Sequence, residues 1–116
     1  MSWSKKTTIQ LVALLSVGWL VDTADAAPVC PVRGGTSLRY VDVFDGPPED
    51  LAILVPDENK KLFGSWQLAY IYKAGRFVTI RCKYADGQAA DVKLPNKVEE
   101  CDYKIDVGKI LSVSCK

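Results

Sequence analysis

Residues 101–115 read CDYKIDVGKILSVSC, and apolar and polar positions alternate on both sides of the turn Val107-Gly108-Lys109. Such alternation on both sides of a glycine-containing turn predicts a β-hairpin. Pairing around this turn places Ile105 opposite Leu111 and Cys101 opposite Cys115, so that one face of the hairpin is apolar. Directly opposed residues of an antiparallel pair are close enough for a disulfide, so the hairpin predicts the bond Cys101–Cys115.

The other two cysteines, Cys30 and Cys82, lie nearer the N-terminus. Four cysteines allow three pairings, and the hairpin register selects the one that leaves Cys30–Cys82 as the second bond. A zinc site is disfavoured because the cysteines form no C-x-x-C pair. An even number of cysteines in a short exported chain indicates disulfides and an oxidising compartment.

Export itself is predicted by the first 26 residues, which have the features of a signal peptide. Lys5 and Lys6 precede an apolar run over residues 9–21, and Ala24-Asp25-Ala26 fits the small-x-small cleavage rule. The alternative, a membrane anchor or a buried helix, is disfavoured because the run is shorter than a spanning helix needs. We therefore expect a signal peptide over residues 1–26, one mature domain over residues 27–116, and no membrane contact after cleavage.

The middle of the chain shows the same alternation as its end. It predicts strands near residues 66–72, 76–84, 88–94, 98–106 and 109–115, with a further strand near residues 38–44. A hairpin around residues 73–75 would set Trp66 opposite Cys82. A second hairpin, around residues 85–87, would set Arg81 opposite Asp91 and keep one face apolar.

One segment departs from this pattern. Proline at its start and acidic residues in its first turn predict a short helix from Pro48 to Leu54, which Pro56 ends. The expected fold class is therefore mainly β. We expect a single small domain, an antiparallel β-meander or sandwich of about five to six strands, with one short helix and two disulfides.

The composition argues against catalysis. The sequence has no histidine, which is the commonest general base and metal ligand. It carries 15 basic and 14 acidic residues, a net charge of +1, and no basic stripe that would bind nucleic acid. We expect no enzymatic activity, no cofactor, no metal site and no nucleic-acid partner.

Two features favour contact with another protein. The proline-rich loop that starts at Phe44 is stiff and acidic, which suits insertion into a partner's cleft, although it would also serve as a structural corner. On the outer face of the central hairpin, Ile71 and Phe77 would form an apolar pair, unless the short helix covers them. The predicted partner-binding residues are Phe44, Asp45, Gly46, Pro47, Pro48, Glu49, Ile71 and Phe77.

The order of short motifs resembles that of a family of small exported bacterial proteins with members in type VI secretion neighbourhoods. The resemblance rests on Cys30-Pro31, on Phe44-Asp45-Gly46-Pro47-Pro48, on Leu54-Val55-Pro56-Asp57 and on the terminal Cys115. It implies a periplasmic, disulfide-bonded domain with no catalytic motif, and suggests an immunity protein that binds and neutralises a secreted effector acting on the cell wall. The alternative is a binding module for a small ligand or an envelope component, on a sheet face around Trp66 and Tyr70. The sequence leaves the oligomeric state open.

Overall fold

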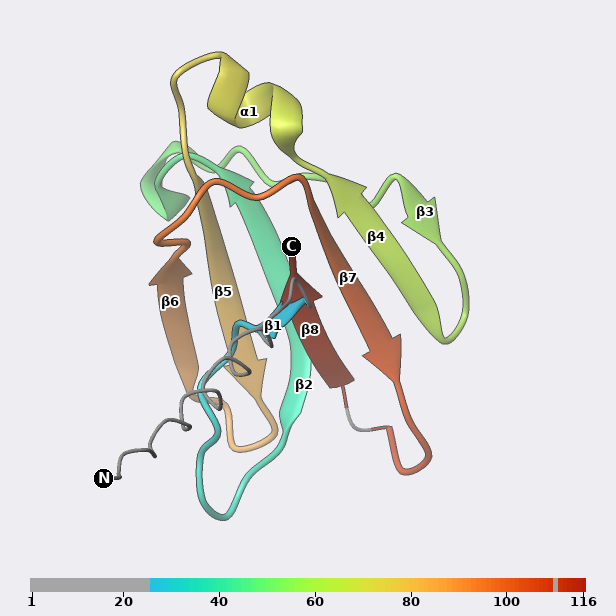
Figure 1. Cartoon of the computed structure of the whole chain (residues 1–116). Helices are drawn as coiled ribbons and strands as arrows, with labels where there is room; N and C mark the ends of the chain where they lie inside the picture. Colours follow the sequence, from blue (N-terminus) through green and yellow to red (C-terminus); the bar gives the residue numbers. More distant parts are fainter. Residues whose placement is uncertain (1–25, 110) are drawn as a thin grey trace, which may run out of the picture.

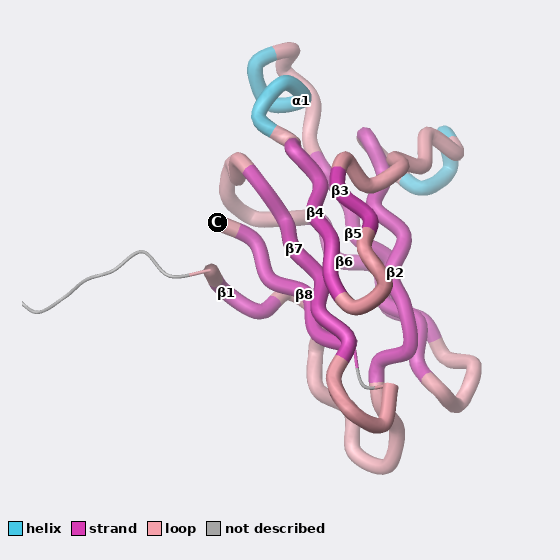
Figure 2. Tube along the Cα trace, turned by 90° about the vertical axis from the view of Figure 1, so that its right-hand side faces the viewer, coloured by secondary structure: helices cyan, strands magenta, loops and turns pink. Residues whose placement is uncertain are grey.

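Two antiparallel sheets, packed face to face, form the domain (Figures 1 and 2). The computed structural model describes residues 26–109 and 111–116, so the predicted signal peptide lies outside the described residues except for Ala26. The five-stranded sheet has the order β1-β8-β7-β4-β3, and the three-stranded sheet has the order β2-β5-β6. The strands are β1 (Ala27–Pro28), β2 (Leu38–Asp45), β3 (Glu58–Asn59), β4 (Phe63–Gln67), β5 (Val78–Tyr84), β6 (Ala89–Lys93), β7 (Glu100–Ile105) and β8 (Leu111–Cys115). The predicted mainly β class is confirmed, with eight strands among the described residues.

The C-terminal hairpin has the predicted register. β7 and β8 pair with Cys101 opposite Cys115 and Ile105 opposite Leu111, and the disulfide Cys101–Cys115 is present. Cys101 is fully buried and Cys115 nearly so. The alternation of apolar and polar residues and the short turn were sufficient to predict this register. A shift of one residue would have moved every apolar side chain to the solvent face.

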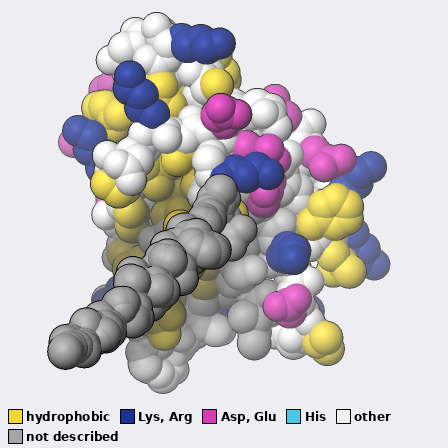
Figure 3. Space-filling view, viewed as in Figure 1, with side chains coloured by type: hydrophobic (Ala, Val, Ile, Leu, Met, Phe, Trp, Pro, Cys, Tyr) yellow, Lys and Arg dark blue, Asp and Glu magenta, His cyan; other side chains and the backbone are white. Residues whose placement is uncertain are grey.

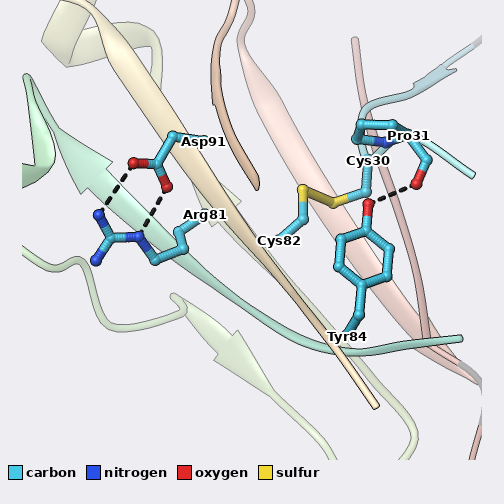
Figure 4. The surroundings of a disulfide bond; sticks show 6 residues. All are labelled: Cys30, Pro31, Arg81, Cys82, Tyr84 and Asp91. Carbon is cyan, nitrogen blue, oxygen red and sulfur yellow. Dashed lines mark hydrogen bonds and ion pairs between the residues drawn. A yellow bond between two sulfur atoms is a disulfide. The ribbon is translucent and has the colours of Figure 1, made fainter. Parts of the chain in front are cut away.

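The hairpin of β5 and β6 also has the predicted register. Ile80 lies opposite Val92 and Arg81 opposite Asp91. The second predicted disulfide, Cys30–Cys82, joins the segment after β1 to the centre of β5 (Figure 4). Beside it, the Tyr84 hydroxyl donates a hydrogen bond to the Pro31 carbonyl oxygen, which holds the same segment against the sheet.

The predicted hairpin of residues 66–72 with residues 76–84 is wrong. β4 ends at Gln67 and pairs with β7 in the five-stranded sheet, whereas β5 belongs to the three-stranded sheet. Between β4 and β5 the chain forms the short helix α1 (Ala69–Lys73) across one end of the sandwich (Figure 1). A helical turn brings Leu68 and Ile71 to the same side, and both are fully buried there. Trp66 consequently lies opposite Cys101 and not opposite Cys82.

The core fills the space between the two sheets. Trp66 is central to it: its ring centroid lies 5.6 Å from that of Tyr103, and its indole N–H donates a hydrogen bond to the Leu54 carbonyl oxygen. This bond connects the segment before β3 to the interior and satisfies the one polar atom of the indole. The other buried residues around Trp66 are Val43, Leu68, Ile71, Val78, Ile80, Cys82, Tyr84, Leu94, Cys101 and Cys115.

Candidate interaction surface

The predicted proline-rich loop folds back onto β2 as a tight corner, which we call the corner loop (residues 45–53). Its predicted helix over Pro48–Leu54 is wrong: only a single 3₁₀ turn forms, at Pro48–Asp50, and Leu51 ends it with a left-handed φ of 58°. The chain then runs back along β2. The Asp45 N–H donates to the Ala52 carbonyl oxygen, and the Leu54 N–H donates to the Val43 carbonyl oxygen. These hydrogen bonds compete with helix formation for the same backbone groups.

The corner loop has a structural part and an exposed part. Phe44, the residue before the loop, is 2% exposed, and Gly46 is buried with a φ of 91° that favours glycine. Pro47 and Pro48 are half-buried. Phe44 and Gly46 therefore form the structural corner, and Glu49 is the predicted contact residue that solvent reaches most freely.

The outer side of the corner loop carries two apolar residues from the segment that was predicted to be a short helix. Leu51 is 77% exposed and Ile53 is 54% exposed, because the chain pairs with the edge of β2 and does not cover the sheet face. Together with Glu49 they form a small apolar and acidic surface.

The loop carboxylate Asp45 already has a partner within the chain. Arg76 donates two hydrogen bonds to it, with Nε–Oδ1 and Nη2–Oδ2 distances of 2.8 and 3.0 Å. This contact raises the pKa of Arg76, chiefly through the hydrogen bond to Asp45. Asp45 thus connects the corner loop to the segment that leads into β5, and the more exposed Glu49 is better placed to meet a basic partner group.

The structure separates the predicted pair of Ile71 and Phe77. Ile71 lies in α1 and is fully buried, so it belongs to the core and not to an exposed surface. Phe77 is half-buried and lies beside the corner loop, where its carbonyl oxygen accepts a hydrogen bond from the Gly46 N–H. The Lys93 ammonium lies 4.3 Å from the centroid of the Phe77 ring. Phe77 and the corner loop, which were predicted as two candidate contacts, are therefore neighbours.

The outer face of the three-stranded sheet, next to the corner loop, is an array of paired charges. Arg81 donates two hydrogen bonds to Asp91, at 2.7 and 3.0 Å (Figure 4), and the Lys83 ammonium lies 2.8 Å from Asp42. The hydrogen bonds from Arg81 lower the pKa of Asp91. Because these pairs are partly solvent-exposed, water screens them and they contribute little to stability, but they give the face a fixed pattern of charge.

On β7, Glu100 and Asp102 are two residues apart and lie on the same face, where a protonated Glu100 carboxyl can donate a hydrogen bond to the Asp102 carboxylate. This contact, together with burial and the charge of Asp102, raises the pKa of Glu100. A raised pKa means that the folded state disfavours the ionised form of the carboxyl group relative to the unfolded state. Ionised Glu100 therefore lowers the free energy of unfolding at pH values above its folded pKa.

We therefore expect Glu100→Gln to raise the free energy of unfolding at pH 7, by less than about 1 kcal/mol because the site is partly exposed. Urea denaturation at pH 7 and at about pH 3.5, below the ordinary glutamate pKa, measures the difference in unfolding free energy between the variant and the wild type. The gain should vanish at the lower pH, where the wild-type carboxyl is also neutral. An equal gain at both pH values would contradict the role of the charge.

The predicted platform of Trp66 and Tyr70 is not formed. Trp66 is 5% exposed on β4, whereas Tyr70 lies in α1 and points to solvent, with 53% of its surface exposed. Among the described residues, no three His, Cys, Asp or Glu side chains are grouped as a metal site would require. In the same part of the chain, no helix is long and apolar enough to span a bilayer.

The fold and its surface define a small disulfide-bonded β-sandwich whose exposed features are a stiff corner loop and a face of paired charges. Residues 33–116 match the family of type VI secretion system Tli immunity proteins, and the chain belongs to this family. The resemblance to a family associated with type VI secretion is thereby confirmed. Comparison with curated proteins and with solved structures finds no match. An immunity protein neutralises an effector, so the predicted role as an immunity protein of a type VI secretion system is confirmed.

Proposed function

We propose that this immunity protein is exported to the periplasm, binds a type VI secretion effector there without chemical turnover, and so protects the cell wall. The observation that carries this proposal is the pair of disulfides in a family of immunity proteins. Cys82 and Cys101 are fully buried, so the bridges are part of the core. Such structural disulfides persist in oxidising compartments and are rare in the cytosol. The predicted signal peptide over residues 1–26 supplies the route to it.

The composition of the chain favours inhibition by binding over catalysis. Without histidine, the chain lacks the usual general base for destroying an effector or its product. The proposed contact is the corner loop with the adjacent Phe77, where Glu49 and Leu51 reach solvent. A stiff loop loses little conformational entropy on binding, and a central apolar residue with a charged neighbour is a common arrangement at tight interfaces.

Neutralisation in the periplasm is tested in cells that direct the cognate type VI secretion effector to the periplasm. Production of the full chain should restore growth, and production of residues 27–116 alone, retained in the cytoplasm, should not. The purified domain and effector should form a one-to-one complex. Release of peptidoglycan fragments in unprotected cells would support the cell wall as the target. Phospholipid breakdown without such release would show that the target is wrong.

The corner loop is tested in the same assay with Glu49→Arg combined with Leu51→Asp. We expect loss of protection with unchanged folding, because both side chains are exposed and aspartate tolerates the left-handed φ at position 51. Val32→Asp is the matched control, since Val32 is 99% exposed and lies outside the corner loop. Equal protection by the loop variant and the control would exclude the corner loop as the contact.

A further inference from the structure

Strand β2 leaves part of a sheet edge open. It is the terminal strand of the three-stranded sheet, and its outer edge is paired with residues 52–54 only at its C-terminal end. Val43 and Asp45 direct their backbone groups to that outer edge. Because every second residue of a strand points the same way, Val41 presents its N–H and carbonyl there too. No strand among the described residues pairs with this part of the edge.

The five-stranded sheet extends past this open edge. In Figure 1, β4 and β3 lie to the right of β2, so one sheet overhangs the other on that side. The overhang encloses a cleft of about 180 Å³, with Arg39–Val41 on one wall and Trp66 and Tyr103 on the other. A second hollow of about 330 Å³ continues it past Tyr40 to Leu62. The cleft therefore offers an unpaired strand edge next to an aromatic wall.

The walls of the cleft and the hollow carry positive charge. The ionisable side chains that line them are Arg39, Lys61, Lys109 and two tyrosines, with no carboxylate among the lining residues. None of the three basic side chains forms an ion pair with another described residue. Their charge is thus available to a ligand, in contrast to the paired charges on the outer face of the same sheet.

Three large hydrophobic residues at or near the cleft and the hollow are exposed. Tyr40 is 59% exposed, Leu62 56% and Phe63 49%. Figure 3 shows hydrophobic side chains at the right-hand border of the molecule, over β3 and β4, next to basic side chains. An exposed apolar surface at an open sheet edge favours pairing with another chain.

We propose that an extended, acidic segment of the effector adds to β2 at Arg39–Asp42 as a fourth strand of the sheet, with an apolar side chain against Trp66 and Tyr103. The inference rests on the proposed function, since it assumes that the chain binds an effector. Main-chain hydrogen bonds along Val41 would supply affinity, and the cleft would select the side chain that points inward. Arg39, Lys61 and Lys109 would select acidic flanks and raise the association rate.

The test compares two triple variants with the same change in charge. The cleft variant is Arg39→Glu, Lys61→Glu and Lys109→Glu, and the control is Lys73→Glu, Lys97→Glu and Lys104→Glu, three exposed lysines that do not line the cleft. We expect the cleft variant to bind the purified effector about 10- to 100-fold more weakly at low salt, mainly through slower association. The control should change the affinity by less than about threefold.

Hydrogen exchange in the complex tests strand addition itself. The Val41 amide, which faces the open edge, should exchange more slowly when the effector is bound, whereas the amides of β6, the opposite edge of the same sheet, should not. If the wild-type chain binds but both triple variants bind equally well, or if the Val41 amide shows no protection, the strand inference is wrong and the proposed function stands. If the wild-type chain does not bind the effector at all, both are wrong.

Discussion

A variant with Cys30→Ala and Cys82→Ala is expected to lose about 4 kcal/mol of unfolding free energy. The bond joins residues 52 positions apart, and in the chain-entropy model a loop of this length is worth about that much. Cys82 is also fully buried, so the smaller alanine side chain leaves unfilled space in the core. Since a domain of this size has a total stability of about 5–10 kcal/mol, a substantial part of it would be lost. Urea denaturation at neutral pH measures the difference.

The second disulfide supplies the control. Cys101→Ala with Cys115→Ala opens a loop of only 14 positions within one hairpin, so we expect a smaller loss of about 3 kcal/mol. A loss below about 1 kcal/mol for the Cys30 and Cys82 pair would show that the bond does not hold the N-terminal segment in the fold. A loss of about 4 kcal/mol of unfolding free energy would mean that a chain without this bond, in a reducing compartment, has little stability left.

Gly64→Ala is expected to destabilise the domain by about 3 kcal/mol, because position 64 has no space for a side chain. An added Cβ would lie 2.3 Å from the Glu58 carbonyl oxygen and 2.3 Å from Cε2 of Tyr103. β3 and β4 pair at this point, with Asn59 opposite Gly64, so the backbone on one side cannot move without breaking the pair. The Tyr103 ring is held on the other side by a hydrogen bond from its hydroxyl to the Asn59 side chain.

Gly34→Ala is the matched control for this substitution. An added Cβ at Gly34 meets no atom within 4 Å, so we expect a change within about 0.5 kcal/mol. Thermal or urea unfolding compares the two variants directly. Equal stability of both would show that Tyr103 and the β3 backbone adjust to the extra atom, which would also weaken the view that Tyr103 forms a rigid wall of the cleft.

The parts of the fold that were predictable are the local ones. The hairpins of β7 with β8 and of β5 with β6 have the expected registers because alternation and turn position together leave one register with an apolar face. The disulfide Cys101–Cys115 follows from the register of β7 with β8, and Cys30–Cys82 follows as the remaining pair. The loop after Phe44 was expected to be either a contact or a corner, and its proline and glycine content is consistent with the corner that forms.

The predictions that failed concern residues whose neighbours are distant in sequence. Residues 66–72 alternate well enough for a strand, yet the chain turns at Leu68 because a helical turn buries Leu68 and Ile71 together at the end of the sandwich. The predicted helix over Pro48–Leu54 was one alternative for covering the sheet face, but the backbone hydrogen bonds to the edge of β2 leave Leu51 and Ile53 exposed. In each case, non-local packing outweighed a local pattern.

The sequence alone determines the shared faces within the two local hairpins, the two cysteine pairs and the lack of a histidine base, and it predicts export. Alternation carries this information because side chains two residues apart in a strand point to the same side. Only the tertiary structure decides which strands are neighbours and which edge stays open, because that choice depends on how the apolar faces of distant segments fit together. The open edge of β2, beside the aromatic wall of Trp66 and Tyr103, is a product of that fit.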